Sequence, residues 1–319
     1  MNFNPIVIVG GEPQSVFIEI FLKSLKKIHH PIILVSSKDL LVKNLKKFNS
    51  SIKFNLLNND FTNVKRKEIN LANVNYNKFS FSKKKITSES NKFIESSFNK
   101  ALEILKKIKC LGLINGPISK KTFLKGKYNG ITEYLAKKTG VKNPVMLIYA
   151  HKLSVSPFTT HIPLSKVSKS INKKLIINKI KSVNHFYINV LKKKPMFAIT
   201  GLNPHCETFS GENKERTEII PAIRYLKKRK INIKGPYASD TIFLEENIKK
   251  FDVVFGMYHD QVLAPIKTLY GFKAINITLG LPFLRISPDH GPNIQMLGKN
   301  KSDPSSLIES IRFLKNNAN

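Results

Sequence analysis

Two histidines follow short apolar segments that are typical of buried β-strands. His205 ends the sequence Gly-Leu-Asn-Pro-His at 201–205, directly after the apolar run 196–200. His259 follows the apolar run 251–257, and Asp260 comes next, where it is placed to cap a helix that starts near Gln261. Because ligands bind beyond the carboxyl ends of strands in open α/β sheets, both histidines occupy positions that favour a functional site.

A third candidate, His161, lies in Thr-Thr-His-Ile-Pro-Leu at 159–164, after an extended Ser/Thr-rich stretch. Three neutral imidazoles can bind a borderline divalent cation and leave positions open for substrate oxygens, which favours Lewis-acid chemistry. Spacing alone does not show that the three converge, and a hydrogen-bonded structural role is the alternative for each. The other histidines are interpreted as surface or loop residues: His29, His30, His151, His185 and His290. Among these five, His290 is the best candidate for a functional role.

Two aspartates and a lysine extend the candidate site. Asp240, in Gly-Pro-Tyr-Ala-Ser-Asp-Thr at 235–241, and Asp260 can orient metal-bound histidines or balance the charge of the cation. Helix N-capping is the alternative role for each aspartate. Lys267 lies about two helical turns after His259, where its ammonium group can meet a phosphate.

Arg285 and Asn276 are more distinctive. Arginine is scarce beside lysine in this chain, which makes Arg285 stand out. Arg285 follows the apolar residues 281–284, so its guanidinium is expected to need a bidentate partner such as a carboxylate or a phosphate. Both residues are therefore candidates for substrate binding.

The elements that must position these residues alternate between short β-branched runs and helical periodicity. This rhythm predicts an α/β fold with a largely parallel sheet. The predicted strands are 5–9, 31–36, 111–115, 145–149, 196–200, 252–257 and 274–278, and the predicted helices are 15–28, 38–48, 88–109, 173–194, 215–228 and 304–315. The Asn- and Lys-rich stretch 58–85 is interpreted as an insertion or flap. The length of 319 residues indicates two lobes around a cleft or one large α/β domain.

The composition is that of a globular chain with a strongly basic balance. The net charge of +33 would attract any polyanion, but the lysines are spread through almost every helical segment. There is no zinc-finger spacing, RNA-recognition signature or basic stripe with interleaved aromatic residues, so no specific nucleic-acid partner is expected.

The apolar runs are too short to span a bilayer, and the two cysteines fit a reducing compartment, so a cytoplasmic location is expected.

Familiar cofactor-binding loops are absent. The Gly-Gly-Glu-Pro at 10–13 follows the first predicted strand, but it does not match the Gly-x-Gly-x-x-Gly dinucleotide fingerprint. The Gly-Pro-Ile-Ser-Lys at 116–120 does not match the Walker phosphate-binding pattern either. A dinucleotide would therefore need another type of site.

Taken together and in order, the motifs of the chain resemble those of the 4-hydroxythreonine-4-phosphate dehydrogenase family of pyridoxal phosphate biosynthesis. The resemblance covers nearly the whole chain. It rests on Gly-Glu-Pro at 11–13, Gly-Pro-Ile-Ser-Lys at 116–120, Gly-Ile-Thr-Glu at 130–133, Thr-His-Ile-Pro-Leu at 160–164, Gly-Leu-Asn-Pro-His at 201–205, Ser-Asp-Thr at 239–241, Met-Tyr-His-Asp-Gln at 257–261, Asn-Ile-Thr-Leu-Gly-Leu-Pro at 276–282 and Asp-His-Gly at 289–291.

The resemblance implies an architecture and an assembly. The fold would be two-lobed and similar to isocitrate and isopropylmalate dehydrogenases, with the active site in the interlobe cleft and shared between the subunits of a homodimer. One catalytic unit would span 1–319, with intertwined lobes at about 1–125 with 270–319 and at about 126–269.

By motif, His161, His205 and His259 match the family's metal ligands, and Asp240 and Asp260 match its site-maintaining aspartates. Thr132, Lys267, Asn276 and Arg285 match its substrate-binding positions.

The resemblance also implies a reaction. The 3-hydroxyl of 4-phosphohydroxy-L-threonine is oxidised with NAD or NADP, and the β-keto acid that results loses carbon dioxide to give 3-amino-2-oxopropyl phosphate. A divalent metal is expected as well, zinc in the first place and manganese, cobalt or magnesium as alternatives. A cation at the hydroxyl would stabilise the developing alkoxide.

The chain departs from the family pattern in three places. The family's Gly-His-Thr-Glu reads Gly-Ile-Thr-Glu, so Ile131 replaces a substrate-binding histidine. The Gly-rich continuation of the first motif and the loop at 206–213 are altered. Two alternatives follow: a related dehydrogenase for another phosphorylated hydroxy acid, such as a four-carbon sugar-acid phosphate, or a basic binding protein on a degenerate dehydrogenase scaffold.

Overall fold

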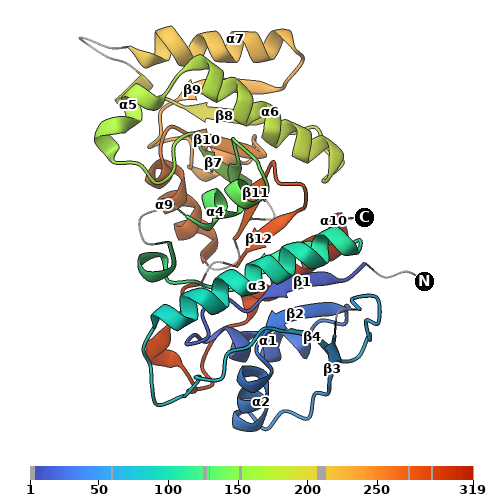
Figure 1. The fold of residues 1–319 in the computed structure, drawn as a ribbon. Coiled ribbons are helices and arrows are strands. Elements are labelled where there is room, and N and C mark those ends of the chain that lie inside the picture. Colours follow the sequence, from blue (N-terminus) through green and yellow to red (C-terminus); the bar gives the residue numbers. More distant parts are fainter. Residues whose placement is uncertain are drawn as a thin grey trace. The chain divides into compact units, whose positions relative to one another are not determined.

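The computed structural model describes residues 4–58, 60–124, 128, 130–150, 153–206, 213–271, 274–288 and 290–318 (Figure 1). The chain divides into two compact units, one formed by Met1–Thr139 with Leu281–Asn319 and the other by Gly140–Gly280. These divisions lie later in the chain than the approximate boundaries expected at 125/126 and 269/270. Among the described residues, no helix combines the length and the apolar character that crossing a bilayer requires.

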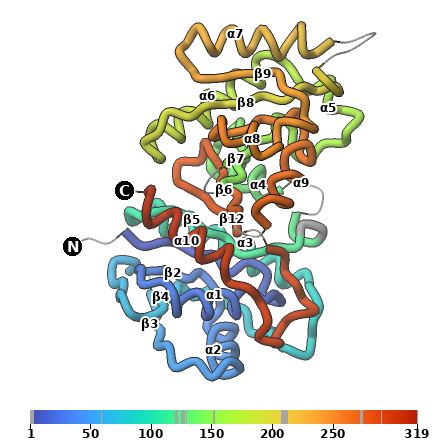
Figure 2. The backbone as a smooth tube through the Cα atoms, turned by 180° about the vertical axis from the view of Figure 1, so that it is seen from behind, coloured from blue at the N-terminus to red at the C-terminus, as the bar shows by residue number. Residues whose placement is uncertain are grey.

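The first unit contains a fully parallel sheet with the strand order β3-β4-β2-β1-β5-β12. Its strands are β1 (Ile6–Val9), β2 (Ile32–Ser36), β3 (Phe54–Leu57), β4 (Ile69–Asn73), β5 (Gly112–Asn115) and β12 (Arg285–Ser287), and its helices are α1 (Phe17–Leu25), α2 (Lys38–Lys47), α3 (Ser88–Lys107), α4 (Ile131–Lys138) and α10 (Ser305–Asn317). Figures 1 and 2 show α3 on one face of this sheet and α1 and α10 on the other. Both faces are therefore covered, which explains why β1 and β2 are buried along their whole length.

Helix α3 shows how local sequence sets these elements. It begins after Thr87, whose hydroxyl accepts a hydrogen bond from the Ser90 N–H at 3.4 Å. Phe93, Ile94 and Phe98 recur at helical spacing and are buried, while lysines occupy the exposed face and the last turn. The amphipathic pattern of the sequence therefore predicted this helix correctly.

The second unit contains a mixed sheet with the strand order β11-β6-β7-β10-β8-β9. Its strands are β6 (Val145–Ala150), β7 (Leu153–Pro157), β8 (Phe197–Thr200), β9 (Ile233–Tyr237), β10 (Val253–Gly256) and β11 (Ile275–Leu279), and its helices are α5 (Val167–Ser170), α6 (Lys173–Asn189), α7 (Ile220–Lys228), α8 (Glu245–Ile248) and α9 (His259–Tyr270). Strand β6 runs antiparallel to β11 and β7, and the pairs β10–β7, β10–β8 and β8–β9 are parallel. The predicted α/β fold with a largely parallel sheet is confirmed.

One predicted element is wrong. The stretch 58–85 was expected to be an insertion or flap, but it contains β4, which pairs with β2 and β3 inside the sheet. Asn70, in the middle of β4, is buried and donates to the carbonyls of Ile32 at 3.1 Å and Lys65 at 2.8 Å. A polar side chain whose hydrogen-bonding groups have partners is stable in a core. In the sequence, however, it interrupts the run of apolar residues that is typical of a buried strand.

Candidate active site

Two of the predicted histidines come together in the second unit. After β7 the chain keeps pairing with the segment that follows β10, because Phe158 donates its N–H to the Gly256 carbonyl at 2.7 Å and Thr159 donates to the Met257 carbonyl. This continued pairing carries His161 to the start of α9. The ring centroids of His161 and His259 lie 5.7 Å apart.

Asp260 contacts the Nδ1 side of the His259 ring. His259 Nδ1 and Asp260 Oδ1 are 2.6 Å apart, and the carboxylate stabilises the tautomer in which Nδ1 carries the proton. The His259 Nε2 lone pair is then available as a metal ligand, as in other carboxylate–histidine–metal arrangements. The predicted N-capping role of Asp260 is wrong, because α9 begins at His259 after the N-cap residue Tyr258 and has no side-chain cap hydrogen bond.

The third histidine, His205, lies in a separate and tightly held loop. Its backbone adopts φ 55°, in the left-handed region that residues other than glycine rarely occupy. Glu215 holds the preceding turn, since its Oε1 accepts from the N–H groups of Leu202 at 2.9 Å and Asn203 at 2.8 Å. His205 itself is exposed, and residues 207–212 of the altered loop lie outside the described part of the chain.

No three side chains among the described His, Cys, Asp and Glu residues of one chain are grouped closely enough to hold a metal ion. The His161–His259 pair therefore provides two imidazole donors, and the described part of a single chain does not add His205 to them. The pair fits a divalent cation in chemistry, because both donors are nitrogens and one is oriented by a carboxylate.

The remaining candidates of the second unit are dispersed. Asp240 is exposed in the turn after β9, and it does not cap α8, whose N-cap residue is Leu244. Lys267 is exposed on α9. Asn276 lies on β11 opposite Ile148, and its Oδ1 is buried without a hydrogen-bond donor among the described residues. That oxygen can accept a hydrogen bond from a ligand.

Arg285 and Thr132 meet in the first unit. Arg285, on β12, is only 2% exposed, and its Nε donates to Asn115 Oδ1 at 2.8 Å while its Nη1 donates to Thr132 Oγ1 at 3.3 Å. Burial lowers the pKa of the guanidinium to about 10, and the Glu133 carboxylate opposes that change. Both of these hydrogen bonds go to neutral side chains, and the bidentate anionic partner expected for Arg285 stays a prediction.

Three residues that the sequence analysis did not single out hold these groups in place. Asn115, at the carboxyl end of β5, accepts the Arg285 hydrogen bond. Gln261 links the ends of β8 and β10, since its side-chain nitrogen donates to the Gly201 carbonyl at 2.9 Å and its Oε1 accepts from the Met257 N–H at 2.6 Å. Glu215 is a buried carboxylate. The scarcity of acidic residues in this chain is a sequence signal that could have drawn attention to it.

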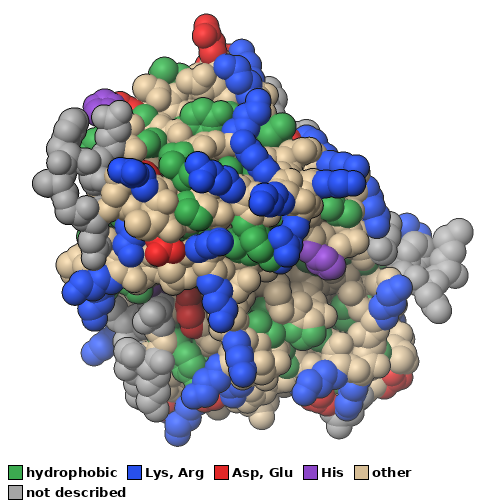
Figure 3. Space-filling model, turned by 90° about the horizontal axis from the view of Figure 1, so that it is seen from above, with side chains coloured by type: hydrophobic (Ala, Val, Ile, Leu, Met, Phe, Trp, Pro, Cys, Tyr) green, Lys and Arg blue, Asp and Glu red, His purple; other side chains and the backbone are tan. Residues whose placement is uncertain are grey.

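Basic side chains are numerous on the face of the molecule drawn in Figure 3. Lysine and arginine side chains are distributed over the face drawn in Figure 3, with polar and apolar side chains between them. This face is therefore generally basic.

Comparison with known proteins identifies the family. The model of the family described as "Pyridoxal phosphate biosynthetic protein PdxA" matches residues 27–314. The chain belongs to the PdxA family. The 4-hydroxythreonine-4-phosphate dehydrogenase of Sulfurihydrogenibium sp. (strain YO3AOP1) is 38% identical over 327 residues, which cover 97% of this chain and 96% of that protein. The resemblance found in the sequence motifs is therefore confirmed.

Solved structures agree with the PdxA assignment. The 4-hydroxythreonine-4-phosphate dehydrogenase from Burkholderia phymatum superimposes with a TM-score of 0.80 at 26% identity, covering 100% of this chain and 98% of that one. The corresponding enzyme from Klebsiella pneumoniae gives a TM-score of 0.82 at 26% identity, with coverage of 99% and 100%. These relatives are oxidoreductases by name, and the family serves pyridoxal phosphate biosynthesis.

Proposed function

We propose that this chain oxidises the 3-hydroxyl of 4-phosphohydroxy-L-threonine with NAD or NADP, and that the β-keto acid formed then loses carbon dioxide to give 3-amino-2-oxopropyl phosphate. The observation that carries the proposal is the convergence of His161 and His259, with Asp260 orienting the second ring, in a chain of the PdxA family. The protein is expected to act in the cytoplasm.

The roles proposed for the residues follow from their chemistry. His161 and His259 would hold a divalent cation, zinc or else manganese, cobalt or magnesium, and such a cation supplies Lewis acidity at the hydroxyl that is oxidised. Asp260 contacts His259 through Nδ1, which leaves Nε2 as the ring nitrogen that would face the cation. We propose that His205 reaches this pair from the second subunit of a homodimer, because the described residues of one chain do not complete a three-ligand group.

Arg285, Thr132, Lys267 and Asn276 are proposed to bind the polar groups of the substrate. The buried guanidinium of Arg285 is already oriented by Asn115 and Thr132, so it binds an anion without first losing side-chain freedom. Asp240 is proposed to support the metal-binding histidines from its exposed turn.

The direct test is turnover of purified protein on 4-phosphohydroxy-L-threonine with NAD and with NADP, with 3-amino-2-oxopropyl phosphate detected by mass spectrometry. Chelation should abolish turnover, and zinc, manganese or cobalt should restore it. Undiminished activity in protein shown by metal analysis to be metal-free would refute the metal role.

A second candidate, a dehydrogenase for another phosphorylated hydroxy acid, is favoured by one observation. Ile131 is buried at the start of α4 and offers no hydrogen bond where the family resemblance implies a histidine. A panel of phosphorylated hydroxy acids assayed in parallel decides between the two. A higher kcat/KM on a four-carbon sugar-acid phosphate would support the second candidate.

A further inference from the structure

The first unit has a pocket at the amino edge of its sheet, the edge at which its parallel strands begin. This amino-edge pocket has a volume of about 520 Å³ and lies between α1 and the three segments that lead into β2, β3 and β4. Substrates and cofactors of open α/β sheets bind beyond the carboxyl ends of the strands, where Asn115 ends β5 and holds Arg285. The amino-edge pocket is therefore separate from these candidate active-site residues.

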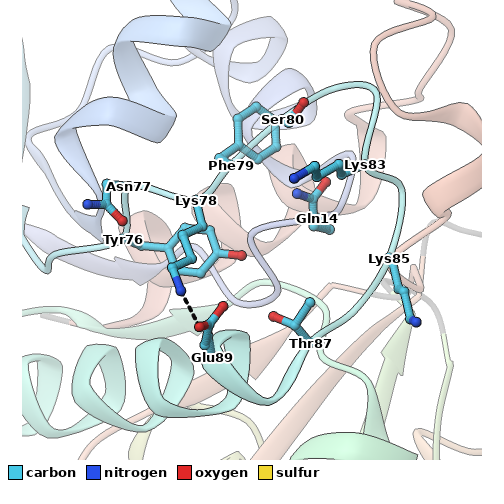
Figure 4. Close-up of a pocket in the computed structure, with 10 residues that line it drawn as sticks. All are labelled: Gln14, Tyr76, Asn77, Lys78, Phe79, Ser80, Lys83, Lys85, Thr87 and Glu89. Atoms are coloured by element: carbon cyan, nitrogen blue, oxygen red, sulfur yellow. Dashed lines mark hydrogen bonds and ion pairs between the residues drawn. The ribbon is translucent and has the colours of Figure 1, made fainter.

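A larger cavity of the same unit, of about 710 Å³, lies at the carboxyl edge and differs in chemistry (Figure 4). Most of the side chains drawn there are polar, and Lys78 is paired with Glu89. In the amino-edge pocket, by contrast, apolar and basic side chains form separate parts of the lining. Both volumes are typical of small-molecule sites, but the two cavities suit different ligands.

The floor of the amino-edge pocket is apolar. The apolar side chains that line it are Phe21, Leu25, Ile28, Ile32, Ile52 and Ile69. Leu25, from α1, and Ile52, from the segment before β3, are only half-buried, so part of each side chain stays in contact with solvent. A ligand with an apolar group would remove that surface from water, which favours binding.

The rim of the amino-edge pocket is basic. Arg66 and Lys67 are exposed on the segment before β4, and among the described residues Lys67 makes no ion pair. The lining includes the carboxylate of Glu68, but Glu68 Oε1 lies 3.5 Å from the Nζ atom of Lys65, which does not line the pocket. The charge of Glu68 is therefore offset, and the rim keeps the positive charge of the other two residues.

The basic segment is held against the floor by Asn70. This buried side chain donates to the carbonyls of Ile32 at 3.1 Å and Lys65 at 2.8 Å, and its Oδ1 accepts from the Lys65 N–H at 2.7 Å. The next residue back, Ile69, donates its N–H to the Lys53 carbonyl at 3.1 Å and so joins the segments before β4 and β3. The walls of the pocket are thus fixed before a ligand arrives, which reduces the entropy lost on binding.

His30, on the segment before β2, reports on the charge at this rim. Its Nε2 lies 3.1 Å from the Asn4 carbonyl oxygen. Burial lowers the pKa of His30, the hydrogen bond to Asn4 opposes that change, and the charges of Lys315 and Arg66 lower the pKa further. Both cations therefore act at the position of His30, and an anion bound beside it would be attracted by both.

We propose that the amino-edge pocket is a second ligand-binding site, which takes a small apolar molecule that carries one phosphate or carboxylate group. The apolar part lies on Leu25 and Ile52, and the anionic group is bound by Arg66 and Lys67. Phosphate and carboxylate oxygens form strong, charge-assisted hydrogen bonds with guanidinium and ammonium groups. The proposal does not depend on which substrate the enzyme oxidises.

The test is calorimetric titration of the full-length protein with 1-naphthyl phosphate, which joins an apolar double ring to one phosphate. Inorganic phosphate and 1-naphthol are titrated in parallel, because each carries only one half of that chemistry. We expect 1-naphthyl phosphate to bind at least about tenfold more tightly than either of them. Titration with 1-naphthoate replaces the phosphate by a carboxylate, and the tighter of the two naphthyl anions identifies the preferred anionic group.

Substitutions in the lining locate the bound probe. Arg66→Gln/Lys67→Gln is expected to raise the dissociation constant of 1-naphthyl phosphate about tenfold or more, and Ile52→Ser roughly fivefold. Lys26→Gln/Lys27→Gln is the matched control, because it removes the same charge from the loop between α1 and β2, but neither lysine lines the pocket. Its effect should stay below about twofold. Urea unfolding of each variant verifies that it is folded.

An active-site variant separates the two possible locations of the probe. Arg285→Met should bind 1-naphthyl phosphate as tightly as the wild type does, because Arg285 donates to Asn115 at the carboxyl end of β5. If Arg285→Met loses binding while Arg66→Gln/Lys67→Gln keeps it, the probe occupies the candidate active site and the proposal is overturned.

Two other results would also overturn the proposal. One is binding of 1-naphthyl phosphate and 1-naphthoate to the wild type with dissociation constants above about 1 mM, which would leave the pocket without a ligand of this class. The other is binding of inorganic phosphate or 1-naphthol as tight as that of 1-naphthyl phosphate, which would show that the apolar floor and the basic rim do not act together.

Discussion

Replacement of Arg285 by methionine should separate substrate binding from folding. The side chain is 2% exposed and donates hydrogen bonds to Asn115 and Thr132. Methionine has a similar length but carries no charge and no donor. We expect Arg285→Met to lower kcat/KM by at least about a hundredfold and to change the free energy of unfolding by less than about 2 kcal/mol.

The small effect on stability follows from opposing contributions. Burial lowers the pKa of Arg285 from 12.5 to about 10, which corresponds to roughly 3 kcal/mol of cost for keeping the guanidinium charged in the folded state. Methionine removes that cost. It also removes the two hydrogen bonds and leaves acceptors such as Asn115 Oδ1 without a donor, which costs about 1–3 kcal/mol. The two contributions are similar in size and opposite in sign.

The large effect on catalysis has a separate origin. A charge-assisted hydrogen bond contributes about 1.5–3 kcal/mol, and a guanidinium can offer two of them to a carboxylate or phosphate. Loss of about 3 kcal/mol in transition-state binding lowers kcat/KM by roughly a hundredfold.

Urea unfolding and steady-state kinetics on the same preparations measure both quantities. Arg312→Met is the matched control, because Arg312 is an exposed arginine of α10 whose Nη1 bonds Glu309 at 2.8 Å, and its loss should change neither quantity appreciably. The reasoning is refuted if Arg285→Met retains kcat/KM within about threefold of the wild type. The stability argument is refuted if the free energy of unfolding of the variant differs from that of the wild type by clearly more than about 2 kcal/mol.

Three further predictions address other parts of the chain. Burial raises the pKa of Glu12 from 4.5 to about 7. The stability that the protonated Glu12 carboxyl provides is therefore fully present below about pH 4.5 and is lost as the pH rises through 7. Urea unfolding at pH 8 should show Glu12→Gln more stable than the wild type, by up to roughly 3 kcal/mol. Mixing inactive His205→Ala subunits with inactive His259→Ala subunits should restore part of the turnover, because each mixed dimer would keep one intact metal site. Ile131→His should lower the Michaelis constant for 4-phosphohydroxy-L-threonine with little change in kcat, because the added contact is to a non-reacting group.

Each of these has an outcome that contradicts it. An equal gap between Glu12→Gln and the wild type at pH 5 and pH 8 would show that the carboxyl does not titrate in this range. Failure to regain activity in proven His205→Ala/His259→Ala heterodimers would remove the shared-ligand claim. If Ile131→His abolishes activity in protein that remains folded and metal-loaded, the pocket is built for a different substrate.

Secondary structure could be predicted from the amino-acid sequence wherever the local pattern of apolar residues dominates. Strand β1 and helix α3 follow directly from apolar runs and helical spacing, because burial of one face is the main force that forms such elements. The ordered motifs also determined the family, and they pointed to His161 and His259 before any contact was known.

Contacts between segments that are distant in sequence could not be predicted from the local pattern. Strand β4 was missed because Asn70 interrupts its apolar pattern, and only the carbonyls of Ile32 and Lys65 make that side chain stable in the sheet. The pairing of β7 with β10 brings His161 to His259, and the pairing of β12 with β5 brings Arg285 to Asn115. Strand pairing joins segments whose separation along the chain is arbitrary, so spacing in the sequence cannot show which candidate side chains meet.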